Sequence, residues 1–481
     1  MDQSFETDPD SDPNPWKYFP FQLGESEYLE KYEPGGFHPV HIGDVYDGRY
    51  RVVHKLGFGG FSTVWLARDT ISHRWAALKI IVASQSQTYE ARSTIASHPS
   101  VIQSPHFAVP DRRFWIDGPN GQHLCLVGPV LGPDLAKLSK GIYSRIKPDF
   151  AKEVSLQAAQ ALAQLHASGI CHGDLTVHNM AVRLTDQFDL YDEADLIDLF
   201  GHPATSPLIT YSRKSPKPHG PDYIVVALDF LASTTPILSR DTCIFDFDQS
   251  FAVGSPPSGR PGIPAKYVAP EVAVGRVLSP ASDIWALGCA IFRLRSGDDL
   301  FFDYDTCCPE DALRQIAKFL GELPDDWKQT RFDEDGFAVA GGQEGDAFWT
   351  LDVTERLEDR IEAILDEPPS LFINDQGQAV EPVDTSMDDQ PGFVIFDPEL
   401  RIPFPAAIGS LAWRPTAICV SGGYFTAYSE ESEEMLKAFP RLSGSESRLL
   451  IDLLSRIFTY DPAKRMKAED VLQHAWFKSS T

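Results

Sequence analysis

The hydrophobic pattern of this chain changes its period near residue 148. Before that point, residues 50–56 alternate apolar and polar side chains in the way that half-buried β-strands do, and the apolar stretch at 75–81 suggests another strand. After it, Val154, Ala158 and Leu162 recur at the spacing of one helical face. The pattern therefore predicts an α+β, bilobal chain: a small β-rich N-terminal lobe and a larger, mostly helical C-terminal lobe.

A second helix is predicted at the centre of the helical lobe. Ser279 suits the N-cap, Pro280 the first turn and Gly297 the end of this helix. The residues between them are apolar almost all round, which is typical of a helix that is buried on every side.

The composition of the remaining segments sets the predicted boundaries. The first 31 residues are rich in Asp, Glu, Pro and Ser, and such a segment cannot bury enough apolar area to offset its ordering entropy. Two further stretches rich in Asp, Glu, Pro and Gly resemble surface insertions. We therefore predict a mobile acidic tail at 1–31, an N-terminal lobe at 32–131, and a C-terminal lobe at 132–477 with insertions at about 184–240 and 325–440.

Charge and cysteine content narrow the function classes. The formal net charge is -27, which disfavours direct nucleic-acid binding and favours cationic partners, although it could serve solubility alone. Seven scattered cysteines without C-x-x-C spacing indicate neither disulfides nor structural zinc. With no leader and no membrane span expected, we predict a soluble monomer of the cytoplasm or nucleus.

Glycines cluster between the first two predicted strands. Residues 57–64 read G-x-G-x-x-S-x-V, and glycine there lets backbone N–H groups approach phosphates. Lys79 on the following strand has the spacing to reach the α- and β-phosphates of a nucleotide. An ordinary glycine hairpin and a solvated strand lysine would give the same pattern, so this region alone does not decide the function.

A polar segment follows the first predicted helix. Asp174 precedes Asn179 by five residues, which lets the carboxylate face an acceptor hydroxyl while the amide oxygen holds magnesium. Asp246 ends an apolar strand downstream and suits a second magnesium ligand. A plain polar loop is the alternative interpretation of residues 172–179.

Three further residues have structural roles in either interpretation. Asp283 lies on the apolar central helix and needs buried hydrogen-bond donors, which the amides of the 172–179 loop would supply. Glu271, in Ala-Pro-Glu, and Arg465 could form a buried ion pair.

Taken in order, these motifs resemble the eukaryotic protein kinases over residues 50–477. Gly-Gly-Phe-His-Pro-Val at 35–40, Gly-Arg-Tyr at 48–50 and Phe-Ser-Thr-Val-Trp-Leu-Ala at 61–67 resemble the SR-protein kinase entry sequence. The long stretch from Asn179 to Asp246, with Ile-Pro-Ala-Lys-Tyr-Val-Ala-Pro-Glu after it, is similar to divergent fungal enzymes of that family.

The resemblance implies ATP and Mg²⁺ as cofactors and a role for each matching residue. Lys79 would contact the phosphates with Glu90 as its helix partner, Asp174 would be the catalytic base, and Asn179 and Asp246 would hold magnesium. The nucleotide-binding residues would be Leu56, Gly57, Phe58, Gly59, Gly60, Val64, Ala77 and Lys79. The hinge would be Gly128, Pro129 and Leu131, with adenine on the Pro129 carbonyl and the Leu131 N–H.

Three residues depart from the family pattern. Gly173 replaces the Arg of H-R-D, so activity without activation-loop phosphorylation is expected. Thr176 replaces the Lys that neutralises the transferred phosphate, and Asp248 replaces the Gly of D-F-G. His178, directly before Asn179, is a candidate to supply the missing positive charge.

Three functions remain open at this point. The first is a serine/threonine kinase acting on basic or Arg/Ser-rich proteins, without direct nucleic-acid or membrane binding. The second is a pseudokinase that binds nucleotide or partners without efficient transfer, which Thr176 and Asp248 favour. The third, a small-molecule phosphotransferase, shares the H-G-D-x-x-x-x-N loop but fits poorly with Glu271, Asp283 and Arg465.

Overall fold

The computed structural model describes most of the chain. It covers residues 16–92, 98–139, 145–233, 235–257, 259–303, 305–339, 345–349, 354–366, 411–413 and 440–479, and the backbone of five short strands between 372 and 425. The chain divides into two compact units: Met1–Ser93 with Pro110–Val130 and Asp186–Phe230, and Thr94–Val109 with Leu131–Thr185 and Leu231–Thr481.

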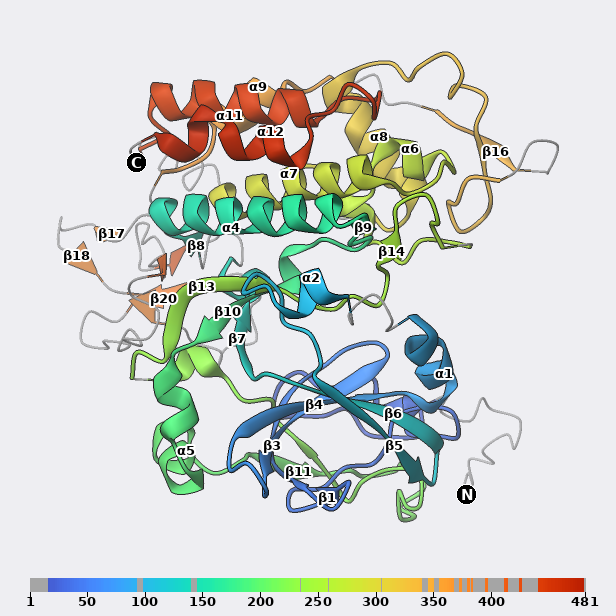
Figure 1. Ribbon diagram of the computed structural model, residues 1–481, viewed down its shortest axis with the longest axis vertical. Helices are drawn as coiled ribbons and strands as arrows, with labels where there is room; N and C mark the ends of the chain where they lie inside the picture. Colours follow the sequence, from blue (N-terminus) through green and yellow to red (C-terminus); the bar gives the residue numbers. More distant parts are fainter. Residues whose placement is uncertain are drawn as a thin grey trace, which may run out of the picture. The chain divides into compact units, whose positions relative to one another are not determined.

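The first unit is built on an antiparallel six-stranded sheet (Figure 1). Its order is β1-β2-β3-β4-β6-β5, and helix α1 (Ala83–Arg92) follows β4. Trp65, Leu78 and Val127 form the centre of its core. The strands are β1 (Val45–Tyr46), β2 (Tyr50–Phe58), β3 (Ser62–Asp69), β4 (Trp75–Ile81), β5 (Arg112–Gly118) and β6 (Gly121–Gly128). The predicted β-rich lobe with its glycine hairpin is confirmed.

The prediction of a mobile tail is wrong for residues 16–31. Tyr18 and Glu27 are buried, and Leu29–Lys31 forms a 3-10 turn. Tyr18 joins a cluster with Phe37 and Ile224, so the segment packs against residues far away in the sequence. The composition of the segment was misleading because a few buried side chains, such as Tyr18, are enough to pack it against the rest of the unit. Residues 1–15 lie outside the described residues.

The segment predicted as the first insertion of the helical lobe belongs mostly to the first unit, because residues 186–230 group with the sheet. Trp75 Nε1 donates to the Tyr191 carbonyl at 3.0 Å, and the Trp75 ring packs against Phe188. Glu193 pairs with Arg51 on β2. The segment contains α5 (Glu193–Phe200), β11 (Thr205–Pro207) and β12 (Tyr223–Val225). Conversely, residues 94–109, with α2 (Pro99–Ile102), group with the second unit.

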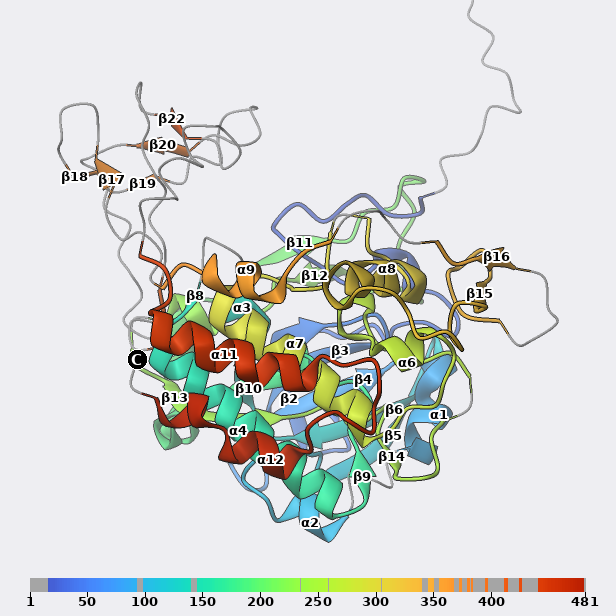
Figure 2. The ribbon, with the colours of Figure 1, turned by 90° about the horizontal axis from the view of Figure 1, so that it is seen from above.

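The second unit is mainly helical, as predicted. Helix α4 (Pro148–Ala167) lies beside α7 (Pro280–Ser296) in Figures 1 and 2. Its other helices are α3 (Leu135–Leu138), α6 (Pro270–Ala273), α8 (Pro309–Leu320), α9 (Leu357–Glu362), α11 (Gly444–Ile457) and α12 (Ala468–Gln473). The short strands include β7 (Leu131–Asp134), β8 (Arg145–Ile146), β9 (Ile170–Cys171), β10 (Met180–Leu184), β13 (Leu238–Ile244) and β14 (Phe251–Ala252).

Helix α7 confirms the predicted central helix. Ser279 is its N-cap, Pro280 its first residue, and Gly297 ends it in the left-handed region at φ 85°. Of the predicted insertion at 325–440, the structure describes β15 (Arg331–Phe332), β16 (Asp346–Ala347) and α9, while most of its second half lies outside the described residues. Within the described part of the chain, no helix is long and apolar enough to cross a membrane.

The predicted buried ion pair is present. Arg465 donates to both carboxylate oxygens of Glu271 at 2.8 and 2.9 Å, and also to the carbonyls of Ala281 and Thr459. The two charged side chains are 0% and 3% exposed. The pair thus joins α6 to the segment that precedes α12.

Glu271→Gln should destabilise the protein strongly. The substitution leaves the Arg465 guanidinium buried without its counter-ion, at a cost of about 3–5 kcal/mol. Asp326→Asn is the matched control, because its partner Arg276 is half exposed and such pairs contribute under about 1 kcal/mol. Denaturant unfolding of both variants checks the prediction, and equal losses would contradict it.

Candidate active site

The glycine-rich turn joins β2 to β3. Gly57 lies opposite Val64, Phe58 lies opposite Thr63, and the Gly59 N–H donates to the Ser62 carbonyl at 2.8 Å. A Cβ added at Gly57, Gly59 or Gly60 would meet nothing within 4 Å. Packing inside the protein therefore does not require these glycines, and their backbone is left open to an approaching ligand.

Lys79 occupies the middle of the sheet. On β4 it pairs with Val64 of β3 and Leu126 of β6, and Ala77 pairs with Gly128 of β6. Because side chains alternate along a strand, Val64, Ala77 and Lys79 share the face opposite the core residue Leu78. Leu56, on β2, is also only partly buried.

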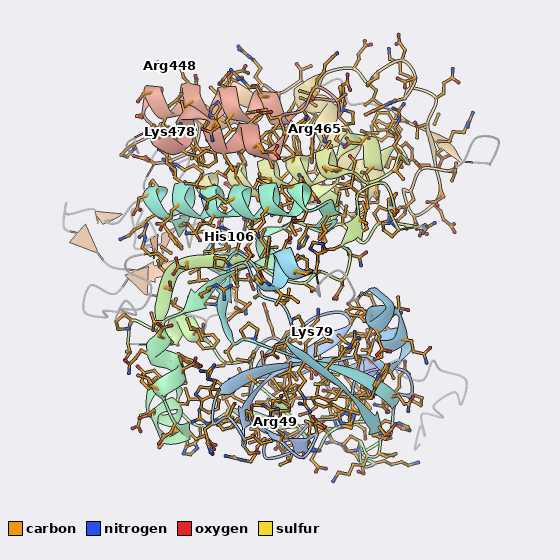
Figure 3. All side chains as sticks on the ribbon, in the orientation of Figure 1. Arg49, Lys79, His106, Arg448, Arg465 and Lys478 are labelled. Atoms are coloured by element: carbon orange, nitrogen blue, oxygen red, sulfur yellow. The ribbon has the colours of Figure 1, made fainter. Side chains whose placement is uncertain are left out.

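Helix α1 brings a second element to Lys79 (Figure 3). The Lys79 ammonium lies 5.4 Å from the centre of the Tyr89 ring. Glu90, the predicted helix partner, is the next residue of α1 and is partly buried. The predicted hinge begins where β6 ends at Gly128, continues through the exposed Pro129, and reaches β7 at Leu131.

The second unit brings together Asp174, Asn179 and the segment that carries Asp246 just after β13. The Asn179 amide donates to the Asp174 carbonyl at 2.8 Å and to its carboxylate at 2.9 Å. The Asn179 carbonyl accepts from the Phe245 N–H at 3.0 Å, so Asp246 follows directly. Asp246 itself has φ 63°, an uncommon value for a residue other than glycine and one that recurs at functional sites.

Asp283 fixes the start of this catalytic loop, as predicted. Its carboxylate accepts from the His172 N–H at 2.8 Å and from the Gly173 N–H at 2.9 Å. His166 Nε2 lies 3.0 Å from the same carboxylate. Asp283 is only 3% exposed, and hydrogen bonds satisfy it as a buried carboxylate requires.

Gly173 is required by the backbone. Its φ is 79°, and a Cβ there would lie 2.4 Å from the Gln249 carbonyl oxygen. Ser250, which follows Gln249, donates a hydrogen bond to the His172 carbonyl at 2.9 Å. The Arg of H-R-D therefore cannot occupy this position unless the segment after Asp246 moves away.

Ion pairs hold the segment after Asp246. Arg260 contacts Asp333 at 2.6 Å and Asp335 at 2.8 Å, and Lys266 contacts Asp299 at 2.8 Å. The pairs of Arg260 are exposed, so solvent screens them and each contributes little to stability. These ion pairs fix the segment after Asp246 to residues 299–335.

His178 is exposed on a 3-10 turn, Val177–Asn179. Loss of water around part of its ring lowers the pKa below 6.5, and the cations Lys266 and Arg293 lower it further, while Asp134 and Asp299 oppose them. The ring is therefore mainly neutral at pH 7, which weakens its predicted role as a cation. Thr176, its near neighbour, is buried.

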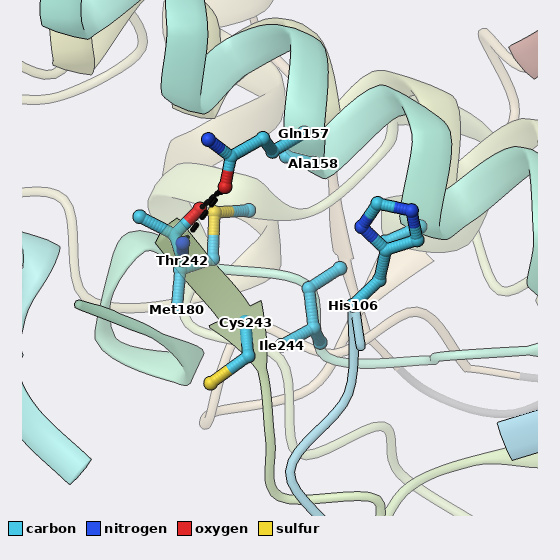
Figure 4. Close-up of a pocket in the computed structure, with 8 residues that line it drawn as sticks. His106, Gln157, Ala158, Met180, Thr242, Cys243 and Ile244 are labelled. Atoms are coloured by element: carbon cyan, nitrogen blue, oxygen red, sulfur yellow. Dashed lines mark hydrogen bonds between the residues drawn. The ribbon is translucent and has the colours of Figure 1, made fainter. Parts of the chain in front are cut away.

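A pocket in the second unit is lined by residues of α4 and of β13, the strand that precedes Asp246 (Figure 4). Gln157 of α4 accepts hydrogen bonds from the Thr242 N–H at 2.7 Å and from its hydroxyl at 2.8 Å. Cys243 is buried, and burial raises the pKa of its thiol to about 11. The side chains that line the pocket thus anchor β13 to α4.

Among the described residues, Cys307, Cys308 and Asp311 form the one group of three or more His, Cys, Asp and Glu side chains whose ligand atoms lie within 4.8 Å of one another. Both thiols donate to the same Asp311 carboxylate oxygen, at 3.3 and 2.9 Å. Burial and this carboxylate raise the pKa of Cys308 to about 12, so its thiol keeps its proton at neutral pH. These contacts form the N-cap of helix α8.

Comparison with known proteins agrees with this geometry. Residues 239–477 match the protein kinase domain family. An SRPK of Physarum polycephalum is 29% identical over 62% of this chain and 73% of its own length. These matches support an SRPK-like protein kinase. The serine/threonine-protein kinase spk-1 of Caenorhabditis elegans is 36% identical over 34% of this chain, and SRSF protein kinase 3 of Homo sapiens likewise.

The matched region makes up a different share of each relative's own length. The matches span only 18% of the nematode protein and 30% of the human one. The predicted family is thus confirmed, whereas the fungal branch within it stays a prediction.

Gly173→Ala should cost more stability than Gly169→Ala. Both glycines have positive φ, 79° and 72°, so each alanine bears about 1–2 kcal/mol of backbone strain. Only at Gly173 does the new Cβ also collide with a carbonyl, which adds about 1–3 kcal/mol. Denaturant unfolding of the two variants measures the difference, and equal losses would disprove the steric explanation.

Proposed function

We propose that this chain is a serine/threonine protein kinase that transfers the γ-phosphate of ATP to protein substrates. The observation that carries the proposal is the pair of hydrogen bonds from Asn179 to Asp174 beside the segment that carries Asp246, just after β13. These bonds turn the amide nitrogen of Asn179 toward the base and leave its oxygen for a cation. A plain polar loop has no need of that arrangement.

The donor set fits magnesium. Mg²⁺ prefers oxygen ligands, and the Asn179 amide and the Asp246 carboxylate offer such oxygens. The ion would neutralise charge on the phosphates when bound. Lys79 would bind the α- and β-phosphates, and the open backbone at Gly57, Gly59 and Gly60 would cover them. Leu56, Val64, Ala77 and the 128–131 hinge would hold the adenine end.

Asp174 would act as the general base. It accepts the proton of the substrate hydroxyl as the bond from that oxygen to the γ-phosphorus forms and the bond to ADP breaks. The hydrogen bond from Asn179 fixes the carboxylate in place. Asp283 has a positioning role, because it holds the backbone of the loop and not the reacting atoms.

The substrate class follows from charge and from the relatives. The net charge of -27 favours basic partners, and one relative is named SRSF protein kinase 3. We infer that the substrates are basic, Arg/Ser-rich proteins. A monomer in the cytoplasm or nucleus, acting without membrane or nucleic-acid contact, completes the proposal.

The alternative is a pseudokinase that binds nucleotide or partners without efficient transfer. Thr176 favours it because it is buried and uncharged where the family has a lysine. Asp248 favours it because it adds an anion two residues after Asp246. Activity measurements separate the two functions.

Asp174→Asn should lower transfer to an Arg-Ser peptide by about 10²–10⁴-fold while Mg-ATP affinity stays the same. The base acts at the chemical step and not in nucleotide binding. Radiolabelled transfer and calorimetric ATP titration measure the two quantities, with an acidic peptide and myelin basic protein as alternative acceptors. Background turnover in both proteins would favour the pseudokinase.

His178→Gln should leave transfer unchanged near pH 7.5 and lower it only on the acidic side. The lowered pKa of His178 means that the imidazolium exists mainly below pH 6.5, where Asp174 must still be ionised. The pH profile of turnover at saturating Mg-ATP for both proteins is the measurement. A several-fold loss near pH 7.5 would show that the ring is charged at neutral pH after all.

A further inference from the structure

Lys55 is a buried cation on the strand that leads into the glycine-rich turn. Its side chain is 1% exposed and pairs with Glu27, which is also 1% exposed. The Tyr32 hydroxyl donates to the other Glu27 oxygen at 2.5 Å. The ammonium also lies 5.3 Å from the centre of the Phe58 ring, at the end of the same strand. Without Glu27, the ammonium of Lys55 would be buried with no counter-ion.

The next residues of the N-terminal segment reach the turn itself. The Lys31 ammonium donates to the Gly60 carbonyl at 2.6 Å and lies 4.9 Å from the centre of the Phe61 ring. Residue 61 in turn binds the end of β4, because its carbonyl accepts from the Val82 N–H at 2.9 Å. Lys31 therefore contacts the glycine-rich turn directly.

The same segment also touches the start of α1. The carbonyls of Gly35 and Gly36 accept from the N–H groups of Ser84 at 2.9 Å and Ala83 at 3.1 Å. A Cβ on Gly36 would lie 1.8 Å from the Lys31 carbonyl, so only glycine allows the chain to close back on itself here. One short segment thus contacts both the turn and the helix that carries Glu90.

We propose that residues 27–36, the N-terminal brace, position the glycine-rich turn and α1 for nucleotide binding, with Glu27 and Lys31 as the positioning residues. The inference rests on the proposed kinase function and adds a role for a segment outside the family's catalytic motifs. Glu27 holds β2 through Lys55, and Lys31 holds Gly60. The brace lowers the freedom of a turn that must order its amides around phosphates.

Lys31→Ala is the main test, because it removes the turn contact and leaves the buried pair intact. The KM for ATP should rise about 2- to 5-fold, the equivalent of one hydrogen bond, with kcat at saturating ATP unchanged. Amide hydrogen exchange at residues 57–62 should become faster while the melting temperature stays the same. Glu193→Gln is the control, because it breaks the Arg51 ion pair on the same strand away from the turn.

Glu27→Gln should have a larger effect on both the KM for ATP and the hydrogen exchange at residues 57–62. The double variant Glu27→Leu with Lys55→Met should reverse part of that effect, because an apolar pair leaves no buried charge.

Unchanged exchange and unchanged KM in Lys31→Ala would overturn the brace. If the wild type transfers no phosphate, the kinase function fails. Faster exchange at 57–62 and weaker binding of a fluorescent ATP analogue in Lys31→Ala would then still support the brace.

Discussion

The buried carboxylate of Asp283 is the interaction on which the catalytic loop depends. It lies on the apolar helix α7, where an unsatisfied charge would be costly, and it accepts both backbone N–H groups at the start of the loop. These two hydrogen bonds fix the backbone at Gly173. This residue has a positive φ and lies so close to the Gln249 carbonyl that a Cβ would collide with it. From there the chain runs into Asp174 and Asn179, so a solvation requirement in the core sets the geometry of the proposed base.

Buried charges recur wherever segments distant in sequence must be joined. Glu271 and Arg465 link α6 to the C-terminal region, and Arg295 with Lys152 surrounds Glu446 on α11. In the first unit, Lys55 does the same for the N-terminal segment. Each pair contributes little net stability. Both partners are nevertheless required, because removing either one would leave the other as an uncompensated buried charge.

The departures from the family pattern have different physical origins. Gly173 is explained by the backbone, since no side chain fits against Gln249, and the ion pairs of Arg260 and Lys266 hold the activation segment by fixed charges. Thr176 is different, because it is buried and leaves no cation in place of the family lysine. The contact with Gln249 thus accounts for the glycine at position 173, whereas position 176 carries no charge of its own.

The sequence by itself determined the elements whose information is local. Helices α4 and α7 follow from apolar period and caps. The spacing of Asp174 and Asn179 predicted their common loop, because residues five apart on one turn lie close together, whereas Asp246 reaches them through the pairing of β13 with β10. Only the tertiary structure decided where residues 16–31 and 186–230 pack. Their few buried groups, such as Glu27 and Phe188, find partners far away in the chain, at Lys55 and Trp75. No local pattern records such pairings, since burial depends on the partner and not on the segment.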